Sequence, residues 1–158
     1  MNIEVTDQKA QIAVAVRKEN ATMAEISLVA TEGLQKVFGF LARQGVEIAG
    51  APYLAYTNGN ADFTRFDVEL GIPIREEIAV DGDFLLSKTC EGKAITATHK
   101  GAYQDVEAVY SALMEYMAEN KLESTGVYYD YYLNNPADTL ESELLTQVVF
   151  PIREEVKR

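Results

Sequence analysis

Two stretches of the chain read alike: Gly50-Ala-Pro-Tyr53-Leu-Ala-Tyr56-Thr-Asn-Gly-Asn-Ala61-Asp62 and Gly126-Val-Tyr-Tyr129-Asp-Tyr-Tyr132-Leu-Asn-Asn-Pro-Ala137-Asp138. At a constant offset the glycine, two tyrosines, the alanine and the aspartate coincide. Further along, the chain repeats Pro73-Ile-Arg-Glu-Glu77 as Pro151-Ile-Arg-Glu-Glu155, which requires two extra residues in the later copy. Five consecutive matches are improbable by chance, so the sequence indicates a duplication of roughly 75 to 80 residues per copy.

Each copy is predicted to form a strand, a helix and two further strands. In the first copy, Thr22 and Glu25 have capping-box spacing, and Gly45 suits the left-handed residue that closes a helix. Apolar residues alternate in the strands and recur at helical spacing in the helices. The predicted elements are 12–16, 26–41, 52–57 and 66–74 in the first copy, and 84–90, 93–99, 103–120, 127–133 and 144–152 in the second. We expect an α+β fold with an antiparallel or mixed sheet and two main helices.

Length, charge and composition narrow the class of protein. The 158 residues suit one domain, 1–158, built from pseudo-repeats of about 1–80 and 81–158. The net charge of −11 repels phosphate backbones and anionic lipid, so we expect neither a nucleic-acid nor a membrane partner. The sequence shows no signal peptide or membrane span, which favours a cytoplasmic location. With only Cys90 and His99 as soft ligands, we expect no metal and no cofactor.

The two copies differ at the centre of their third strand. Strand alternation gives Leu54 and Asp130 equivalent positions, and it places Asp130 on one face with Tyr128 and Tyr132. Two more tyrosines of the same segment lie on the opposite face. An apolar position of the first copy has therefore become a carboxylate among tyrosines.

The acid among tyrosines has two interpretations. It is either a solvated residue of an edge strand, or the floor of a pocket walled by aromatic rings. Tyrosine faces attract cations and stack on flat rings, and a carboxylate in a region of low dielectric favours a positively charged ligand. A desolvated acid can also exchange protons.

Other polar residues carry weaker signals. We interpret His99 as a hydrogen-bonded structural residue, and Asp67 and Glu69 as solvated residues on the polar face of a strand. Tyr103 and Tyr110 lie one heptad apart on a helix, where a core role is favoured although either could reach the pocket. No glycine-rich phosphate loop is present.

The order and spacing of several segments resemble the GyrI-like small-molecule-binding domain. They are Thr98-His-Lys-Gly-Ala-Tyr103, a helix with Tyr110 and Leu113, Tyr129-Asp-Tyr-Tyr-Leu-Asn-Asn-Pro136 and Leu145-Thr-Gln-Val-Val-Phe-Pro-Ile152, with Tyr53-Leu-Ala-Tyr56 and Asp67-Val-Glu-Leu-Gly-Ile-Pro73 resembling its first half. The resemblance implies a duplicated strand–helix–strand–strand fold, a curved sheet and a ligand groove between the copies. The family usually carries Glu where this chain has Asp130, which keeps the charge but shortens its reach.

In its relatives, this module is the effector-binding part of multidrug-sensing regulators, a gyrase-inhibitory protein, or a stand-alone protein. Since the DNA-binding part is missing here, the resemblance implies a stand-alone binding protein for hydrophobic, aromatic and often cationic xenobiotics. An alternative is a hydrolase that opens cyclopropane rings, with Asp130 activating water and Tyr132 polarising a carbonyl. A third is an acidic protein-interaction module. The predicted ligand-binding residues are Tyr53, Leu54, Tyr56, Tyr103, Tyr110, Tyr128, Asp130, Tyr132 and Phe150.

Overall fold

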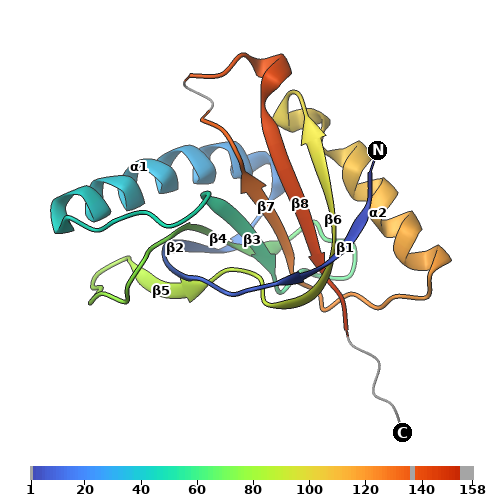
Figure 1. Ribbon diagram of the computed structural model, residues 1–158, viewed down its shortest axis with the longest axis horizontal. Helices are drawn as coiled ribbons and strands as arrows, with labels where there is room; N and C mark the ends of the chain where they lie inside the picture. The colour runs from blue at the N-terminus through green and yellow to red at the C-terminus, as the bar shows by residue number, and fades with distance from the viewer. Residues whose placement is uncertain (1, 136–137, 154–158) are drawn as a thin grey trace, which may run out of the picture. The chain divides into compact units, whose positions relative to one another are not determined.

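The computed structural model describes residues 2–135 and 138–153 and divides the chain into two compact units (Figure 1). Unit 2 is Ala10–Thr89, and unit 1 combines the residues up to Lys9 with the chain from Cys90 onward. Four residues quoted in the sequence patterns, namely Pro136, Ala137, Glu154 and Glu155, lie outside the described residues.

Unit 2 is an antiparallel sheet covered on one face by a helix. Its strand order is β3-β4-β2-β5, and α1 packs on the apolar face (Figure 1). The elements are β2 (Ile12–Ala21), η1 (Met23–Glu25), α1 (Ile26–Gln44), β3 (Tyr53–Thr57), β4 (Phe66–Pro73) and β5 (Leu85–Lys88). Its core contains Val14, Val37, Phe40, Leu41, Ile72 and Ile74.

Unit 1 repeats this plan with the strand order β1-β6-β8-β7 and α2 on its apolar face. The elements are β1 (Glu4–Gln8), β6 (Gly92–Lys100), η2 (Tyr103–Asp105), α2 (Glu107–Glu119), β7 (Tyr128–Tyr132), η3 (Glu141–Glu143) and β8 (Leu145–Pro151). Its core contains Ile95, Ala97, Val109, Leu113, Met117, Val148, Phe150 and Ile152.

The duplication extends to individual backbone pairs. Tyr53 is paired with Gly71 in unit 2, and the equivalent Tyr129 is paired with Val149 in unit 1. Beyond the strands, the Ala49 N–H donates to Pro73 as the Thr125 N–H donates to Pro151. The predicted α+β class and the duplicated strand–helix–strand–strand order are confirmed, and every described strand pairing is antiparallel.

The strand at the start of each repeat pairs with a strand of the other repeat. β1 pairs with β6 in unit 1, whereas β5 pairs with β2 in unit 2. The sequence pattern predicts β5 at the start of the second copy and does not predict β1. A five-residue strand with Val5 as its one apolar residue and mostly exposed side chains gives too weak an alternation to detect.

Two local predictions around α1 are confirmed, and the capping box stands at the start of η1, which leads directly into α1. The Glu25 carboxylate accepts the backbone N–H of Thr22 at 3.0 Å, and Gly45 ends the helix with a φ of +66°. The sequence does not reveal the role of Gly33, where a Cβ would lie 2.9 Å from Leu70 Cδ2, so the absence of a side chain allows this close approach of helix and sheet.

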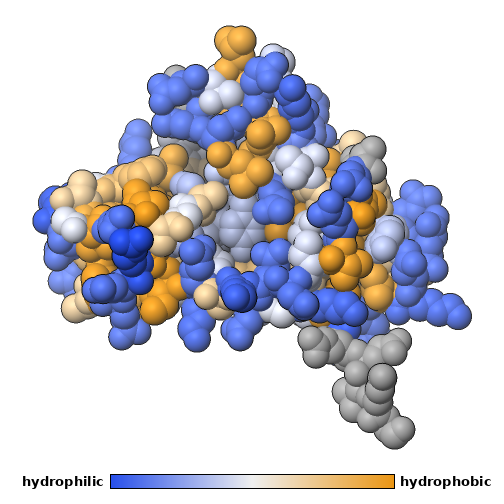
Figure 2. Space-filling model, viewed as in Figure 1, coloured by the Kyte–Doolittle hydropathy of each residue, from blue (hydrophilic) through white to orange (hydrophobic). Residues whose placement is uncertain are grey.

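Hydrophilic residues cover most of the visible surface, and apolar residues form separate patches (Figure 2). The exposed large apolar side chains include Leu28, Met114 and Leu140. Within the described ranges, none of the helices has the length and apolar character needed to cross a bilayer.

Candidate functional site

Strand β7 places Asp130 beneath α2 rather than in solvent. Asp130 pairs with Val148, a core residue of unit 1, and only 5% of its surface is exposed. The phenol of Tyr110 on α2 donates a hydrogen bond to Oδ1 of Asp130. The interpretation of this acid as a solvated edge-strand residue is therefore wrong. A carboxylate at this depth needs such donors to offset its desolvation.

Aromatic rings surround this acid and form what we call the Asp130 cluster, namely Tyr103, Tyr110, Tyr128, Asp130, Tyr132 and Phe150. The rings meet edge to face, with centroids 4.7 Å apart for Tyr128 and Phe150 and 5.2 Å apart for Tyr103 and Tyr132. Phe150 and Asp130 are buried, whereas the four tyrosines are partly exposed. Asp130 and Phe150 are thus the most buried members of the cluster.

Burial and charge keep two of these phenols protonated. Desolvation, followed by the negative charge of Asp130, raises the pKa of Tyr110 well above its ordinary value. The same two causes, in the same order, raise the pKa of Tyr132, and burial raises that of Tyr103. These hydroxyls therefore remain hydrogen-bond donors at neutral pH.

Three rows of side chains cross the helix-facing surface of this sheet, from β6 through β8 to β7. The rows are His99–Thr146–Tyr132, Ala97–Val148–Asp130 and Ile95–Phe150, with the ring of Tyr128 against Phe150. All three side chains of the first row carry polar atoms, whereas Ile95 and Phe150 in the last row are apolar. His99 is hydrogen-bonded as predicted, because its Nε2 lies 2.8 Å from the carbonyl oxygen of Ala102 and must donate to it.

The remaining three predicted residues lie in unit 2. Leu54 is fully buried and pairs with Leu70, and the ring of Tyr56 meets that of Phe66 edge to face at 5.4 Å. Tyr53 points to the opposite face of its strand, where its ring covers Gly71 so closely that a Cβ would lie 2.5 Å from it. Burial raises the pKa of Tyr53 to about 12.

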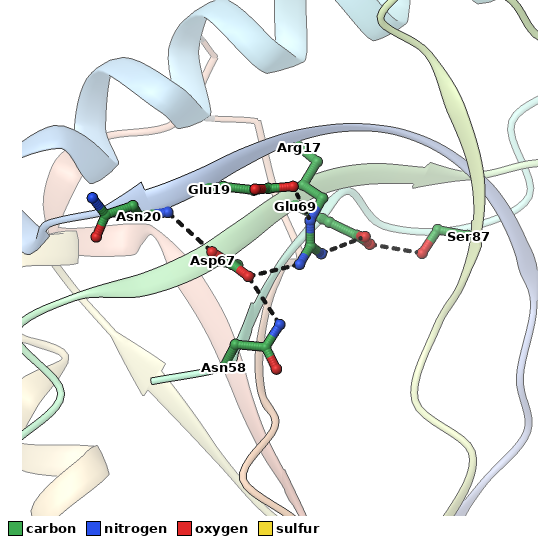
Figure 3. Close-up of polar contacts among 7 residues, drawn as sticks. All are labelled: Arg17, Glu19, Asn20, Asn58, Asp67, Glu69 and Ser87. Carbon is green, nitrogen blue, oxygen red and sulfur yellow. Dashed lines mark hydrogen bonds and ion pairs between the residues drawn. The ribbon is translucent and has the colours of Figure 1, made fainter. Parts of the chain in front are cut away.

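The helix-free face of unit 2 carries a network of charges that the sequence analysis missed (Figure 3). Arg17 donates to Asp67 at 2.8 Å and to Glu69 at 3.0 Å. Asn58 donates to Asp67, and Ser87 donates to Glu69. The two carboxylates, with side chains 18% and 16% exposed, are not the solvated residues we expected.

The network holds Asp67 in its ionised form. Hydrogen bonds from Asn58, then from the backbone of Asn20, and then the charge of Arg17 lower the pKa of Asp67. Sequence separation hid this arrangement, because Arg17 lies on β2 and both acids lie on β4. The available signal was strand alternation, which places Arg17 opposite Glu69 once the strands are paired.

The duplicated α+β fold is the fold that the resemblance to a small-molecule-binding domain implied. The sequence matches the family described as GyrI-like small molecule binding domain over residues 1–153. The chain therefore belongs to the GyrI-like family, as the resemblance implied. A sequence comparison with curated proteins gives no match.

Solved structures of three proteins share this fold. The EcmrR C-terminal domain has a TM-score of 0.81 at 17% identity, with 98% of each chain covered. EcmrR in a complex with DNA has a TM-score of 0.83 at 15% identity, and the match covers 98% of the present chain but 58% of EcmrR. SAV2435 bound to tetraphenylphosphonium has a TM-score of 0.67 at 10% identity, and the match covers 97% of the present chain and 94% of SAV2435. A hydrolase from Listeria innocua has a TM-score of 0.66 at 11% identity, and the match covers 96% of the present chain and 91% of the hydrolase.

Proposed function

We propose that this small-molecule-binding protein takes flat, hydrophobic and often cationic ligands, and that the Asp130 cluster binds them. The observation that carries the proposal is the burial of Asp130 among four tyrosine residues that are themselves partly exposed. Sequestration or sensing of drugs and other xenobiotics is the role that fits such a site.

The cluster combines two attractions for an aromatic cation. The rings of Tyr103 and Tyr132, which meet edge to face, offer surfaces for stacking and for cation–π contact. Asp130 lies in a region of low dielectric, where its charge acts over a longer range than it would in water. SAV2435, which has the same fold, was solved with tetraphenylphosphonium, a lipophilic aromatic cation, and this supports the proposed ligand class.

The charge of the whole chain supports the same ligand class. A net charge of −11 raises the local concentration of cations near the protein and opposes contact with nucleic acid or anionic lipid. We include in the proposal a cytoplasmic setting and a site that acts without nucleic-acid or membrane partners.

Titration with tetraphenylphosphonium tests the assignment. We expect Asp130→Asn to weaken binding by about 1–3 kcal/mol, roughly 5- to 150-fold, because it removes the charge and keeps the shape. Asp83→Asn is the matched control, since it makes the same change of net charge at an exposed position. Equal affinity of the two variants, both folded by circular dichroism, would remove the Asp130 cluster from the site.

The hydrolase alternative has less support. The likeness to the Listeria hydrolase, at 11% identity, concerns the fold alone. Incubation with a cyclopropane-bearing alkylator and detection of the water adduct by mass spectrometry tests it. A rate above that in buffer, lost in Asp130→Asn, would replace simple binding with catalysis.

A further inference from the structure

Thr146 carries a buried hydroxyl that the fold does not use. It lies on β8 and pairs with His99 on one side and Tyr132 on the other, in the polar row of the helix-facing surface. Only 2% of its surface is exposed. In the part of the chain that the structure describes, its Oγ1 has no hydrogen-bond partner. Buried hydroxyls without a partner are rare, because burial removes their water and returns nothing.

The duplication shows which residue the fold alone would accept at this position. The equivalent of Thr146 in unit 2 is Val68, which pairs with Tyr56 as Thr146 pairs with Tyr132. Val68 is fully buried. Valine and threonine have nearly the same shape, so the hydroxyl of Thr146 adds polarity without filling additional space.

The two polar replacements in this layer are neighbours. Asp130 stands where unit 2 has Leu54, and Thr146 stands where it has Val68. Asp130 pairs with Val148 and Thr146 with Tyr132, so the acid and the hydroxyl are diagonal neighbours on one face of adjacent strands. Diagonal side chains lie about 7–8 Å apart at their base. Since both side chains extend from their bases, their oxygen atoms can approach closely enough to share one donor nitrogen through two hydrogen bonds of about 2.9 Å.

We propose that Asp130 and Thr146 form a two-point site for a primary ammonium group on an aromatic ligand. This inference rests on the proposed function of the Asp130 cluster and names its preferred ligand class. One N–H of the ammonium donates to the carboxylate of Asp130, and a second donates to Oγ1 of Thr146. A quaternary ammonium or phosphonium ion satisfies the carboxylate by charge alone and leaves the hydroxyl without a partner.

The experiment compares two probes that differ only at nitrogen, (pyren-1-yl)methylammonium and its N,N,N-trimethyl derivative. The intact protein should bind the primary ammonium about tenfold more tightly, the value of one hydrogen bond to a charged group. Thr146→Val should reduce this preference by weakening the binding of the primary ammonium alone, since the hydrogen bond to Asp130 remains. Thr98→Val, the same change at an exposed position, serves as the control and should preserve the preference. An unchanged preference in Thr146→Val would overturn the inference.

Two further measurements separate the inference from the function on which it rests. Asp130→Asn should weaken the binding of both probes. Unchanged affinity for both probes would overturn the proposed function together with this inference. If Asp130→Asn weakens both probes and Thr146→Val weakens neither, the proposed function stands and the two-point site does not. The melting temperature of Thr146→Val should be equal to or above that of the parent, and a lower value would show that the hydroxyl already has a partner in the free protein.

Discussion

The two units have the same backbone pairing but carry their polar side chains on opposite faces of their sheets. In unit 1, the acid Asp130 and the hydroxyl of Thr146 lie beneath the helix, where unit 2 has Leu54 and Val68. The helix-facing layer of unit 2 is therefore apolar at the positions where unit 1 is polar.

The helix-free face shows the reverse. Unit 2 carries the network of Arg17, Asp67 and Glu69 there. The residues at the equivalent positions of unit 1 are Thr98, Leu145 and Gln147. One half of the duplicated chain thus combines a carboxylate with aromatic rings, and the other half builds a saturated ion network. The backbone plan tolerates both because each face of a strand varies independently.

The largest expected effect comes from exchanging the residues at the centre of the third strands. Leu54→Asp places a carboxylate in an apolar layer and should lower the free energy of unfolding by about 3–5 kcal/mol. Asp130→Leu removes a buried charge and should cost much less stability while it abolishes binding of aromatic cations. Urea denaturation measures both. Equal losses in the two variants would contradict the difference between the two layers.

A smaller effect is expected on the helix-free faces. Arg17→Met leaves Asp67 and Glu69 side by side without their cation, and it should lower the free energy of unfolding by about 1–2 kcal/mol, between the values of exposed and buried ion pairs. Thr98→Met, at the equivalent position of unit 1, should change it by less than about 0.5 kcal/mol. Denaturation at low and high salt provides the measurement, and equal effects would show that the network adds no stability.

The smallest effects appear at extreme pH. In alkali the raised pKa values of Tyr110 and Tyr132 mean that the folded state keeps protons that the unfolded chain loses, so stability falls as the pH rises above about 10. Tyr132→Phe should flatten this decline in a series of melting curves. In acid, the lowered pKa of Asp67 means that stability falls as the pH drops below about 4, and Asp67→Asn should flatten that decline. A variant with the slope of the parent would contradict the corresponding half of this prediction.

Much of this arrangement follows from the sequence. The repeat predicts the pairing of third and fourth strands, and the spacing of Thr22 and Glu25 predicts the start of α1. Strand alternation predicts that Leu54 and Asp130 are equivalent. These features are local, or they are repeated, so one copy confirms the other.

The features that the sequence does not predict depend on contacts between residues far apart in the chain. Asp67 and Glu69 have the alternation of solvated residues, and only the pairing of β2 with β4 brings Arg17 to them. The unpaired hydroxyl of Thr146 is likewise a property of its surroundings, since the sequence shows only a threonine in a strand. Side-chain pairing of this kind is fixed by tertiary structure and not by pattern.

The pairing of β1 with β6, and of β5 with β2, sets an order of events during synthesis. Unit 2 is a continuous segment, so all of its strands are available once Thr89 has left the ribosome. β1 is made before unit 2, but its partner β6 ends at Lys100, so β1 waits for about 90 residues of translation, or roughly 4.5–18 s. Its short length and its acids Glu4 and Asp7 suit a strand that must stay unpaired without aggregating. A strand made before unit 2 therefore finds its partner only after unit 2 is complete.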